Sequence, residues 1–437
     1  MLQDSFAVLG YLYLMVIHNH ELWLLLFPML LLFELPLYLL VLTGIFRWSY
    51  PTPIPPLKHY PSLSFIVTCY SEGDDIAITI DTLVEQLYPG QIEILVIIDG
   101  ASQNKETYLA ALRSKHKYRA IKQREIIVIP KWQRGGRVSS CNAGLAIAKG
   151  EVVFSLDGDS SFDNDMALEM AKHFKNPNTI ACGGALRVRN HRTNIITRMQ
   201  SIEYMLSMQA GKTGMANWGV LNNISGAFGA FKTGIVKQAG GWDTHTAEDL
   251  DITIRLKQYK MRYRNHQIDF APHAVGHTDV PDTLKGLVMQ RLRWDGDLLF
   301  LFFRKHRQSL TPALLGWGNF VFMLVYGVVQ NILLPLVVAG YTAFIVIKYP
   351  LSIVAALTMM LYSAYLFFSL LLFTVYYFLI SERKEDWRSV VWLPLYPVYQ
   401  YFMRLVTAFA MINEVIRRSH EESSMAPWWV LRRGKKF

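Results

Sequence analysis

The sequence predicts an α/β domain with a mostly parallel sheet, inserted between hydrophobic segments at both ends of the chain. Of the 437 residues, 52% are hydrophobic, and the mean hydropathy of +0.20 is too high for an ordinary soluble enzyme. Charged residues still make up 18%, and the mixed, charged region lies between the two hydrophobic ends. There, short apolar runs alternate with helical segments, which is typical of βαβ units and a parallel sheet.

Net charge and cysteine content narrow the class of protein. A formal charge of +10 suits contact with anionic lipid headgroups and with a phosphate-bearing substrate. No basic-aromatic module is present, so we expect no nucleic-acid partner. The three cysteines show no metal-ligand spacing and are odd in number, which favours a reduced, cytosolic domain without disulfides.

The N-terminal region predicts a membrane anchor. Residues 6–17 form an apolar run of 12, marginal for a crossing, whereas residues 22–46 form one of 25, which is sufficient. Arg47 and Trp48 mark the cytosolic interface, and no cleavage site is evident. Glu34 lies inside the second run, where an ionisable residue either has a function or makes a structural hydrogen bond to a neighbouring helix.

Five prolines in residues 51–61 predict an extended linker before the α/β domain. The elements that follow are read from apolar runs and helical periodicity. We expect strands at 63–68, 92–98, 125–129 and 152–156, with helices at 76–87 and 139–148.

Two aspartates end the last of these strands. Asp157 and Asp159 are separated by one glycine, so both side chains point to the same side of the chain. Like charges at a strand's carboxyl end need a neutralising cation, and ligands of open α/β sheets bind at that edge. A hard cation that bridges to a nucleotide diphosphate would meet both conditions. The alternative is an acidic loop after a core strand.

Two more residues are expected near this edge. Asp99 also ends a buried strand, where a carboxylate can accept hydrogen bonds from a nucleobase or ribose. Arg137 follows two glycines and is well placed for a diphosphate or uracil, although a solvated arginine is the alternative.

Further along, a small glycine-rich stretch at residues 225–229 suits close approach by a ligand or by the chain. Glu248 and Asp249 then begin a predicted helix, where the helix dipole alone would favour them. His273 and His277 lack a third metal ligand nearby and are interpreted as ordinary polar residues.

The remaining chain predicts interfacial and membrane segments. The amphipathic segment from Gln290 to Phe303 is typical of a helix on a membrane surface, with Trp294 at the seam between domain and bilayer. Apolar blocks follow at residues 314–347, 351–380 and 390–412. The charged stretch after the second block and the basic tail should both face the cytosol. The last block is therefore expected not to cross, unless the first block is two elements.

Together, four motifs resemble those of the membrane-embedded, processive family 2 glycosyltransferases, which include cellulose, hyaluronan and poly-N-acetylglucosamine synthases. In chain order they are Asp99-Gly100, Asp157-Gly158-Asp159, Glu248-Asp249 and Gln290-x-x-Arg293-Trp294. The resemblance implies a GT-A fold, a UDP-sugar donor, Mg²⁺ or Mn²⁺, and a growing glycan acceptor threaded through the membrane helices.

The resemblance also implies roles for individual residues. Asp249 would be the catalytic base with Glu248 beside it, and Asp159 would ligate the metal. The implied donor and acceptor contacts are Asp99, Arg137, Asp157, Gln290, Arg293 and Trp294. Departures from the usual motifs occur at Ser71, Arg137, Ala247 and Asp295-Gly-Asp297, and the Trp428-Trp429 tail resembles a hyaluronan synthase gate only weakly.

The function expected on this basis is an inverting, processive synthase of an exported polysaccharide, with UDP-N-acetylglucosamine or UDP-glucose as the candidate donor. The alternatives are a non-processive transferase that adds one sugar to a lipid acceptor, and a scaffold with a decayed site. The protein should be a multi-pass protein of the cell membrane, in contact with the lipid bilayer; an accessory membrane subunit is left open. The expected regions are transmembrane (1–50), cytosolic catalytic (51–297), interface helix (298–310), transmembrane or interfacial (311–416) and basic cytosolic tail (417–437).

Overall fold

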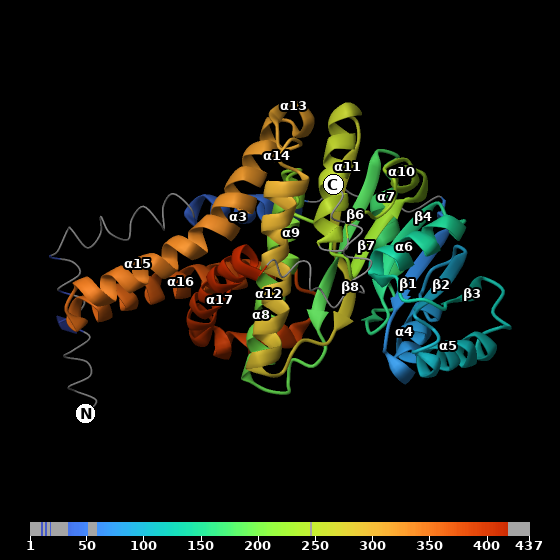
Figure 1. Cartoon of the computed structure of the whole chain (residues 1–437), viewed down its shortest axis with the longest axis horizontal. Helices are drawn as coiled ribbons and strands as arrows, with labels where there is room; N and C mark the ends of the chain where they lie inside the picture. Colours follow the sequence, from blue (N-terminus) through green and yellow to red (C-terminus); the bar gives the residue numbers. More distant parts are fainter. Residues whose placement is uncertain are drawn as a thin grey trace.

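The computed structural model describes residues 10, 11, 14, 18, 34–50, 59–244 and 247–417 (Figure 1). The expectations for the first apolar run as a whole, for the second run before residue 34, for most of the proline linker and for the basic tail lie outside these residues.

One eight-stranded sheet runs through the described part of the chain in the order β3-β2-β1-β4-β7-β6-β8-β5. Four strand pairings are parallel and three are antiparallel, because β7 runs opposite to both β4 and β6, and β5 runs opposite to β8. The sheet is therefore mixed, and only its β3-β2-β1-β4 half is uniformly parallel, as expected. The strands are β1 (Leu63–Cys69), β2 (Ile92–Asp99), β3 (Arg124–Lys131), β4 (Val152–Asp157), β5 (Ser161–Phe162), β6 (Thr179–Val188), β7 (Phe228–Lys232) and β8 (Gln267–Thr278).

The two helices predicted in the parallel half exist with shifted ends. Helix α4 (Ile76–Val84) stops three residues earlier than expected, because the backbone N–H of Leu87 leaves the helix to bond the carbonyl of Asn164. Helix α6 (Gly136–Ile147) begins three residues earlier than expected. Its first residue has a φ of 81°, which glycine adopts without strain.

Helices cover both faces of the sheet (Figure 1). Apolar residues alternate along β1, so that Phe65 and Val67 face one layer and Ile66 faces the other. The first layer packs on α4, α5 (Lys105–Lys117) and α7 (Met166–Phe174). The second packs on α6, α10 (Thr233–Gln238) and α11 (Glu248–Arg262), where Ile252 and Leu256 face the core.

A helical part adjoins the sheet through α8 (Ile195–Glu203), the π-helix η3 (Tyr204–Gly211) and α9 (Lys212–Asn217). Helix α3 (Leu35–Ser49) packs closely on α9 near Gly44 and Gly214. A Cβ on Gly44 would overlap the backbone of α9, and a Cβ on Gly214 would overlap the backbone of α3. Glu34, just before α3, is buried and pairs with Arg404, and it accepts a hydrogen bond of 3.3 Å from Tyr365. The partners of Glu34 thus lie on neighbouring helices, which favours the interpretation that it has a structural role.

Helix α12 (Leu284–Phe300) continues into a short π-helix, η4 (Leu301–Lys305), so the expected boundary at residues 297/298 falls inside a helix. It packs along α17 (Tyr396–Arg417), with Arg291 and Asp297 buried (Figure 1).

Two helices are long and apolar enough to cross a membrane, by length and composition: Trp317–Lys348 and Leu351–Leu379. The first comprises α14 (Trp317–Phe322), the π-helix η5 (Met323–Leu333) and α15 (Leu334–Lys348), and the second is α16. Gly316, with a φ of 75°, separates the short α13 (Pro312–Leu315) from α14 at the start of the first apolar helix.

After α16 the chain returns to the α/β domain. Glu382 lies 3.2 Å from His273, and Arg383 pairs with Asp163. The two apolar helices thus form a hairpin. The last apolar block is split between the 3-10 helix η6 (Lys384–Leu395), which contains Pro394, and α17.

Candidate active site

The carboxyl ends of the parallel strands bring the predicted strand-end residues to one edge of the sheet. Asp157 is paired in register with Thr68 on β1, and Asp99 ends the next strand, β2. Gly158 follows Asp157 where β1 packs closely, because a Cβ there would lie 2.9 Å from the sulfur of Cys69. The three cysteines are buried and free, as expected for a domain without disulfides.

Arg137 lies between the two acidic motifs and contacts both. It occupies the first turn of α6, and its Nη1 pairs with Asp157 while its Nε lies 2.8 Å from Oε1 of Glu248. The same guanidinium donates to the carbonyl of Gly226 and, at 3.3 Å, to Oγ1 of Thr68. A planar cation with five donors in a fork can satisfy all these acceptors at once. Its donors are thus engaged within the protein.

Glu248 is held in this cluster at the start of α11. Burial raises the pKa of its carboxyl, Arg137 lowers it, and the neighbouring Asp249 raises it again. Gly226 comes from the glycine-rich stretch and leaves no room for a side chain, because a Cβ there would lie 2.8 Å from Oε1 of Glu248. The close approach predicted for this stretch is made by the chain itself.

Asp249 is held by one hydrogen bond from outside α11 and one from its own helix. Its Oδ2 accepts a hydrogen bond of 2.7 Å from Nδ2 of Asn223, and its Oδ1 accepts one from the backbone N–H of Leu250. Lys212 is buried close enough for the charge of Asp249 to influence it; burial lowers the pKa of this lysine to about 8. Ala247 begins the helix with a φ of 47°, a left-handed conformation that non-glycine residues rarely adopt. Such strain concentrates at functional sites.

Asp251, two residues further along α11, has a different environment. It is fully buried, and its carboxylate contacts Arg255, Lys305 and His306 at 2.7–2.9 Å. Although burial opposes ionisation, these partners hold the pKa of Asp251 below its ordinary value. It therefore ties α11 to η4 and does not face the same partners as Asp249.

Asp99 is also engaged within the protein. It is 4% exposed, and Lys131 lies 2.7 Å from its Oδ1. The backbone N–H groups of Gly135 and Gly136 each donate to it at 2.8 Å, so Asp99 caps the start of α6. The predicted contact of Asp99 with a nucleotide stays a prediction.

Asp159 is the exposed carboxylate at this edge, and it has no ion-pair partner among the described residues. Its one hydrogen bond comes from the hydroxyl of Ser160 at 3.4 Å. Nearby, Oε2 of Glu72 is buried without a hydrogen-bond partner, and burial and the charge of Asp159 both raise the pKa of Glu72.

Hard oxygen donors of this kind fit Mg²⁺ or Mn²⁺. Across the described residues, no group of three His, Cys, Asp or Glu side chains is arranged to hold a metal. The protein would thus supply few ligands, which suits a cation that takes its other ligands from substrate phosphates and water.

The two histidines on β8 bind Asp163 and Glu382, in agreement with their interpretation as ordinary polar residues.

Helix α12 carries the third predicted group. Oε1 of Gln290 is buried and has no hydrogen-bond partner among the residues that the structure describes, and the guanidinium of Arg291 lies 4.9 Å from the ring centre of Trp294. Arg291 also pairs with Glu203 at 2.6 Å. One face of Trp294 is therefore covered by the protein.

Asp297, one turn after Trp294, connects α12 to the acidic start of α11. Burial raises the pKa of Asp297, and Glu414, Glu248 and Asp249 raise it further, while Arg293 lowers it. The carboxylates of α11, Arg293 and Asp297 thus lie within electrostatic reach of one another.

Sequence reasoning missed Glu72, Lys212 and Asn223. A polar residue that is buried at a helix or strand end is a weak signal, and each of these became notable only through its neighbour in space. The sequence marks Asp297 only as part of a departure from the usual motif.

Comparison with solved structures agrees with this architecture. A mannosyltransferase from Pyrobaculum calidifontis, solved in complex with GDP-Man and Mn²⁺, matches with a TM-score of 0.53 and 19% sequence identity. The match covers 84% of this chain and 95% of that chain. The mixed sheet with its carboxylates at one edge is a glycosyltransferase domain of the GT-A fold.

Family models and related proteins identify the glycosyltransferase family to which the chain belongs. Glycosyl transferase family 2 matches residues 64–237, and Glycosyl transferase family group 2 matches residues 152–409. The chain belongs to this family and is a family 2 glycosyltransferase. Poly-beta-1,6-N-acetyl-D-glucosamine synthase of Staphylococcus epidermidis is 26% identical over 377 residues, which cover 84% of this chain and 86% of that protein. The synthase of Staphylococcus aureus (strain MSSA476) is 31% identical over 233 residues, 53% of each chain.

Proposed function

We propose that the protein is an inverting, processive polysaccharide synthase that polymerises a sugar from a UDP-sugar donor and exports the product across the cell membrane. One observation carries the assignment of the site: Arg137 joins Asp157 of the first acidic motif to Glu248 of the second. This bridge brings the expected donor side, at Asp157 and Asp159, next to the expected base, Asp249.

Asp249 would act as the general base. The acceptor hydroxyl oxygen forms a bond to the anomeric carbon of the donor, and Asp249 takes the hydroxyl proton. The bond between that carbon and the diphosphate oxygen breaks, and its electron pair leaves with the nucleoside diphosphate. Asn223 and the N–H of Leu250 fix the carboxylate for this proton transfer.

Asp159 would hold a divalent cation, Mg²⁺ or Mn²⁺, with Glu72 close by. Such an ion neutralises charge on the leaving diphosphate. The mannosyltransferase named above was solved with Mn²⁺, which supports a metal of this class. Asp99 and Asp157 would fix the conformation of the sheet edge at which the donor binds. Arg137 would act as a positioning residue for Asp157 and Glu248.

On the acceptor side, Gln290, Arg293 and Trp294 would contact the diphosphate and the acceptor sugar. The unpartnered amide oxygen of Gln290 can accept a hydrogen bond from a sugar hydroxyl. An arginine can pair a phosphate in a forked geometry, and the free part of an indole face suits a sugar ring.

Export is supported by the position of the two apolar helices. They follow α12 in the chain after the short η4 and α13, and the segment after them returns to the α/β domain. With the catalytic domain in the cytosol, this hairpin would lie in the cell membrane beside the acceptor end of the site. The Staphylococcus relatives are named as synthases of a polysaccharide, which supports polymer formation and suggests N-acetylglucosamine as the sugar.

The test is to incubate detergent-purified full-length protein with single UDP-sugars and Mn²⁺ and to size the product. We expect one UDP-sugar, UDP-N-acetylglucosamine first, to yield long chains at low conversion of the acceptor. A product extended by a single sugar would indicate the alternative, a non-processive transferase acting on a lipid acceptor. Absence of nucleoside diphosphate release with every donor would contradict both.

A further inference from the structure

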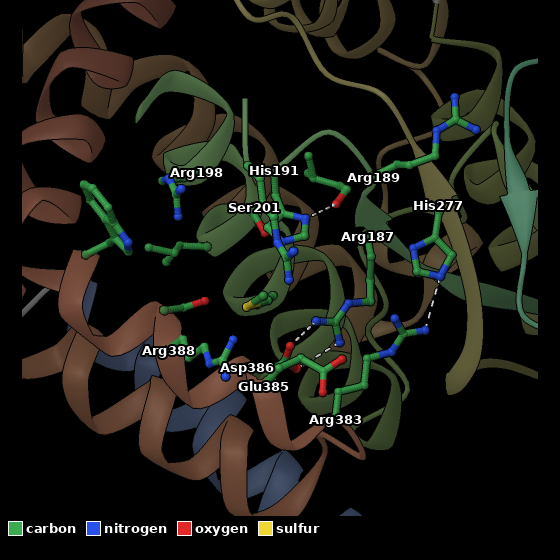
Figure 2. A pocket seen from close by; sticks show the side chains of 16 residues that line it. Arg187, Arg189, His191, Arg198, Ser201, His277, Arg383, Glu385, Asp386 and Arg388 are labelled. Atoms are coloured by element: carbon green, nitrogen blue, oxygen red, sulfur yellow. Dashed lines mark hydrogen bonds and ion pairs between the residues drawn. The ribbon is translucent and has the colours of Figure 1, made fainter. Parts of the chain in front are cut away.

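A cavity of about 370 Å³ lies where β6 and β8 end against α8 and η6, and none of its lining residues belongs to the acidic motifs of the candidate active site (Figure 2). Its charged lining is strongly basic. The lining itself has six arginines, two carboxylates and two histidines: Arg187, Arg189, Arg192, Arg198, Arg383, Arg388, Glu385, Asp386, His191 and His277. Two further carboxylates, Asp163 and Asp279, pair with arginines of the lining, so the formal excess is two positive charges.

Local structure explains how arginines gather here. Arg187 and Arg189 are two residues apart at the end of β6, so they leave the strand on the same side. Helix α8 then begins with a capping box in which Asn194 binds Thr197, and this fixed start places Arg198 on the first turn. The third wall comes from η6, which carries Arg388.

Three of the arginines are neutralised by the protein and build rigid walls. Arg187 donates from both terminal nitrogens to Asp386 and also contacts the hydroxyl of Tyr376. Arg189 makes a forked pair with Asp279. Arg383 pairs with Asp163, whose pKa is lowered by this contact and by His277 against the effect of burial.

The other three arginines outnumber Glu385, the remaining carboxylate of the lining, and carry the unbalanced positive charge. Arg192, Arg198 and Arg388 have no carboxylate partner within the residues that the structure describes. Arg198 stacks 4.8 Å from the ring centre of Trp392, an interaction that orients its guanidinium without neutralising it. Three cations around one cavity repel one another unless an anion joins them.

Arginine forks match the oxygens of a phosphate group, and several such pairs around one cavity are the usual means of binding phosphate in proteins. The hydroxyls of Ser201 and Ser389 also line the cavity and can donate to further oxygens. The chemistry of the lining therefore selects a phosphate-bearing ligand.

The position of the cavity indicates where that phosphate comes from. Helix η6 begins shortly after the apolar helix α16 ends, and it exposes Trp387 and Val391. Tryptophan is enriched at the level of lipid headgroups, where basic pockets beside membrane helices bind anionic lipids. We propose that this cavity binds a phosphate group, carried by an anionic phospholipid headgroup at the membrane surface, as a site separate from the donor site.

The test uses full-length protein in detergent, titrated with short-chain phosphatidylglycerol, with short-chain phosphatidylcholine, and with inorganic phosphate. Binding is followed by thermophoresis, and Arg192→Gln/Arg388→Gln is compared with Arg119→Gln/Arg262→Gln. All four side chains are exposed, so folding should be unaffected, and both pairs remove the same charge. Gel filtration checks this.

We expect phosphatidylglycerol to bind the wild type and the control pair equally, and the cavity pair to lose affinity about tenfold or more, the scale of a lost charge-assisted hydrogen bond. Binding of inorganic phosphate with the same dependence on the two arginines, but not of the lipid, would assign the phosphate to a soluble source. Equal affinity in all variants would overturn the proposal. So would displacement of the lipid by UDP with Mn²⁺, because Arg189 lies within electrostatic reach of Asp159 and a shared site would then be the explanation.

Discussion

The Nε atom of Arg137 lies 2.8 Å from Oε1 of Glu248, although 111 residues separate them, and the same guanidinium pairs with Asp157. Two acidic motifs that are far apart in the sequence are thereby joined by one cation. A buried charge that loses its partner costs far more free energy than an exposed one, so this contact should dominate the stability of the site.

Replacement of Arg137 should therefore destabilise the protein. We expect Arg137→Met to lower the free energy of unfolding by about 3–5 kcal/mol, because two carboxylates are left uncompensated. The double variant with Glu248→Gln should recover part of this loss, and the coupling is measured by a double-mutant cycle on unfolding in detergent. Arg113→Met breaks an exposed pair with Asp74 and should change stability by about 0–1 kcal/mol. Equal effects of the two methionine substitutions would contradict a buried bridge.

Asp249→Asn should separate catalysis from binding. We expect affinity for the UDP-sugar to be nearly unchanged and turnover to fall roughly 100-fold or more, the scale of a lost general base. The substitution is almost isosteric, and Asn223 can still bond the new side chain. Asp243→Asn, which alters an exposed partner of Lys305, is the control and should keep full turnover. Near-normal turnover of Asp249→Asn would leave this residue a role in capping α11 only.

Asp159→Asn should abolish the divalent-dependent part of donor binding, because an amide cannot replace the charge that the cation requires. Calorimetry with UDP, with and without Mn²⁺, measures this difference. Asp165→Asn changes another exposed aspartate and should retain the Mn²⁺ effect. If Asp159→Asn bound UDP with unchanged Mn²⁺ dependence, the metal would belong elsewhere.

Lys212 should make stability depend on pH in the alkaline range. Burial lowers the pKa of Lys212 from 10.5 to about 8, so the folded protein holds this proton less tightly than the unfolded chain does. The penalty is complete below pH 8 and disappears as the pH rises toward the unfolded pKa. Lys212→Met should thus stabilise the protein at pH 7 by about 1–3 kcal/mol and flatten the rise of the unfolding midpoint from pH 8 to 10. The exposed Lys149→Met should do neither, and an unchanged pH profile in Lys212→Met would refute the assignment.

The hairpin of apolar helices predicts the sidedness of two positions. In intact cells, a cysteine at Lys348, beside the turn between the helices, should react with a membrane-impermeant thiol reagent. A cysteine at Glu382, which contacts the α/β domain, should be protected until the membrane is opened. The native cysteines are buried and should give little background. A cysteine at Lys436 should also be protected if α17 does not cross; labelling there, or the reverse pattern at the first two positions, would contradict this topology.

Local pattern alone located much of the fold and the carboxylates of the site. Apolar runs bounded by turn residues identified β1 to β4, and the spacing of Asp157 and Asp159 placed both at the carboxyl edge. This succeeded because strand periodicity and the direction of parallel strands are encoded by neighbours in sequence. The same reasoning did not detect β5 to β8. Three of these strands contain glycines and β5 has only two residues, so none gives a regular apolar pattern. The reversed direction of β7, which makes the sheet mixed, also leaves no periodic signal in the sequence.

The partners of the charged residues were decided by tertiary structure. Nothing local distinguishes Asp249, which keeps a carboxylate held by Asn223, from Asp251, which is surrounded by three cations. Arg137 contacts acidic residues from two other elements, while its contact with substrate stays a prediction. Glu34 pairs with Arg404, which lies hundreds of residues further along the chain. The sequence by itself determined which residues carry charge and on which edge of an element they lie. Only the tertiary structure decided which charged groups are buried next to one another. This common burial determines which charges are neutralised by the protein and which remain available to a ligand.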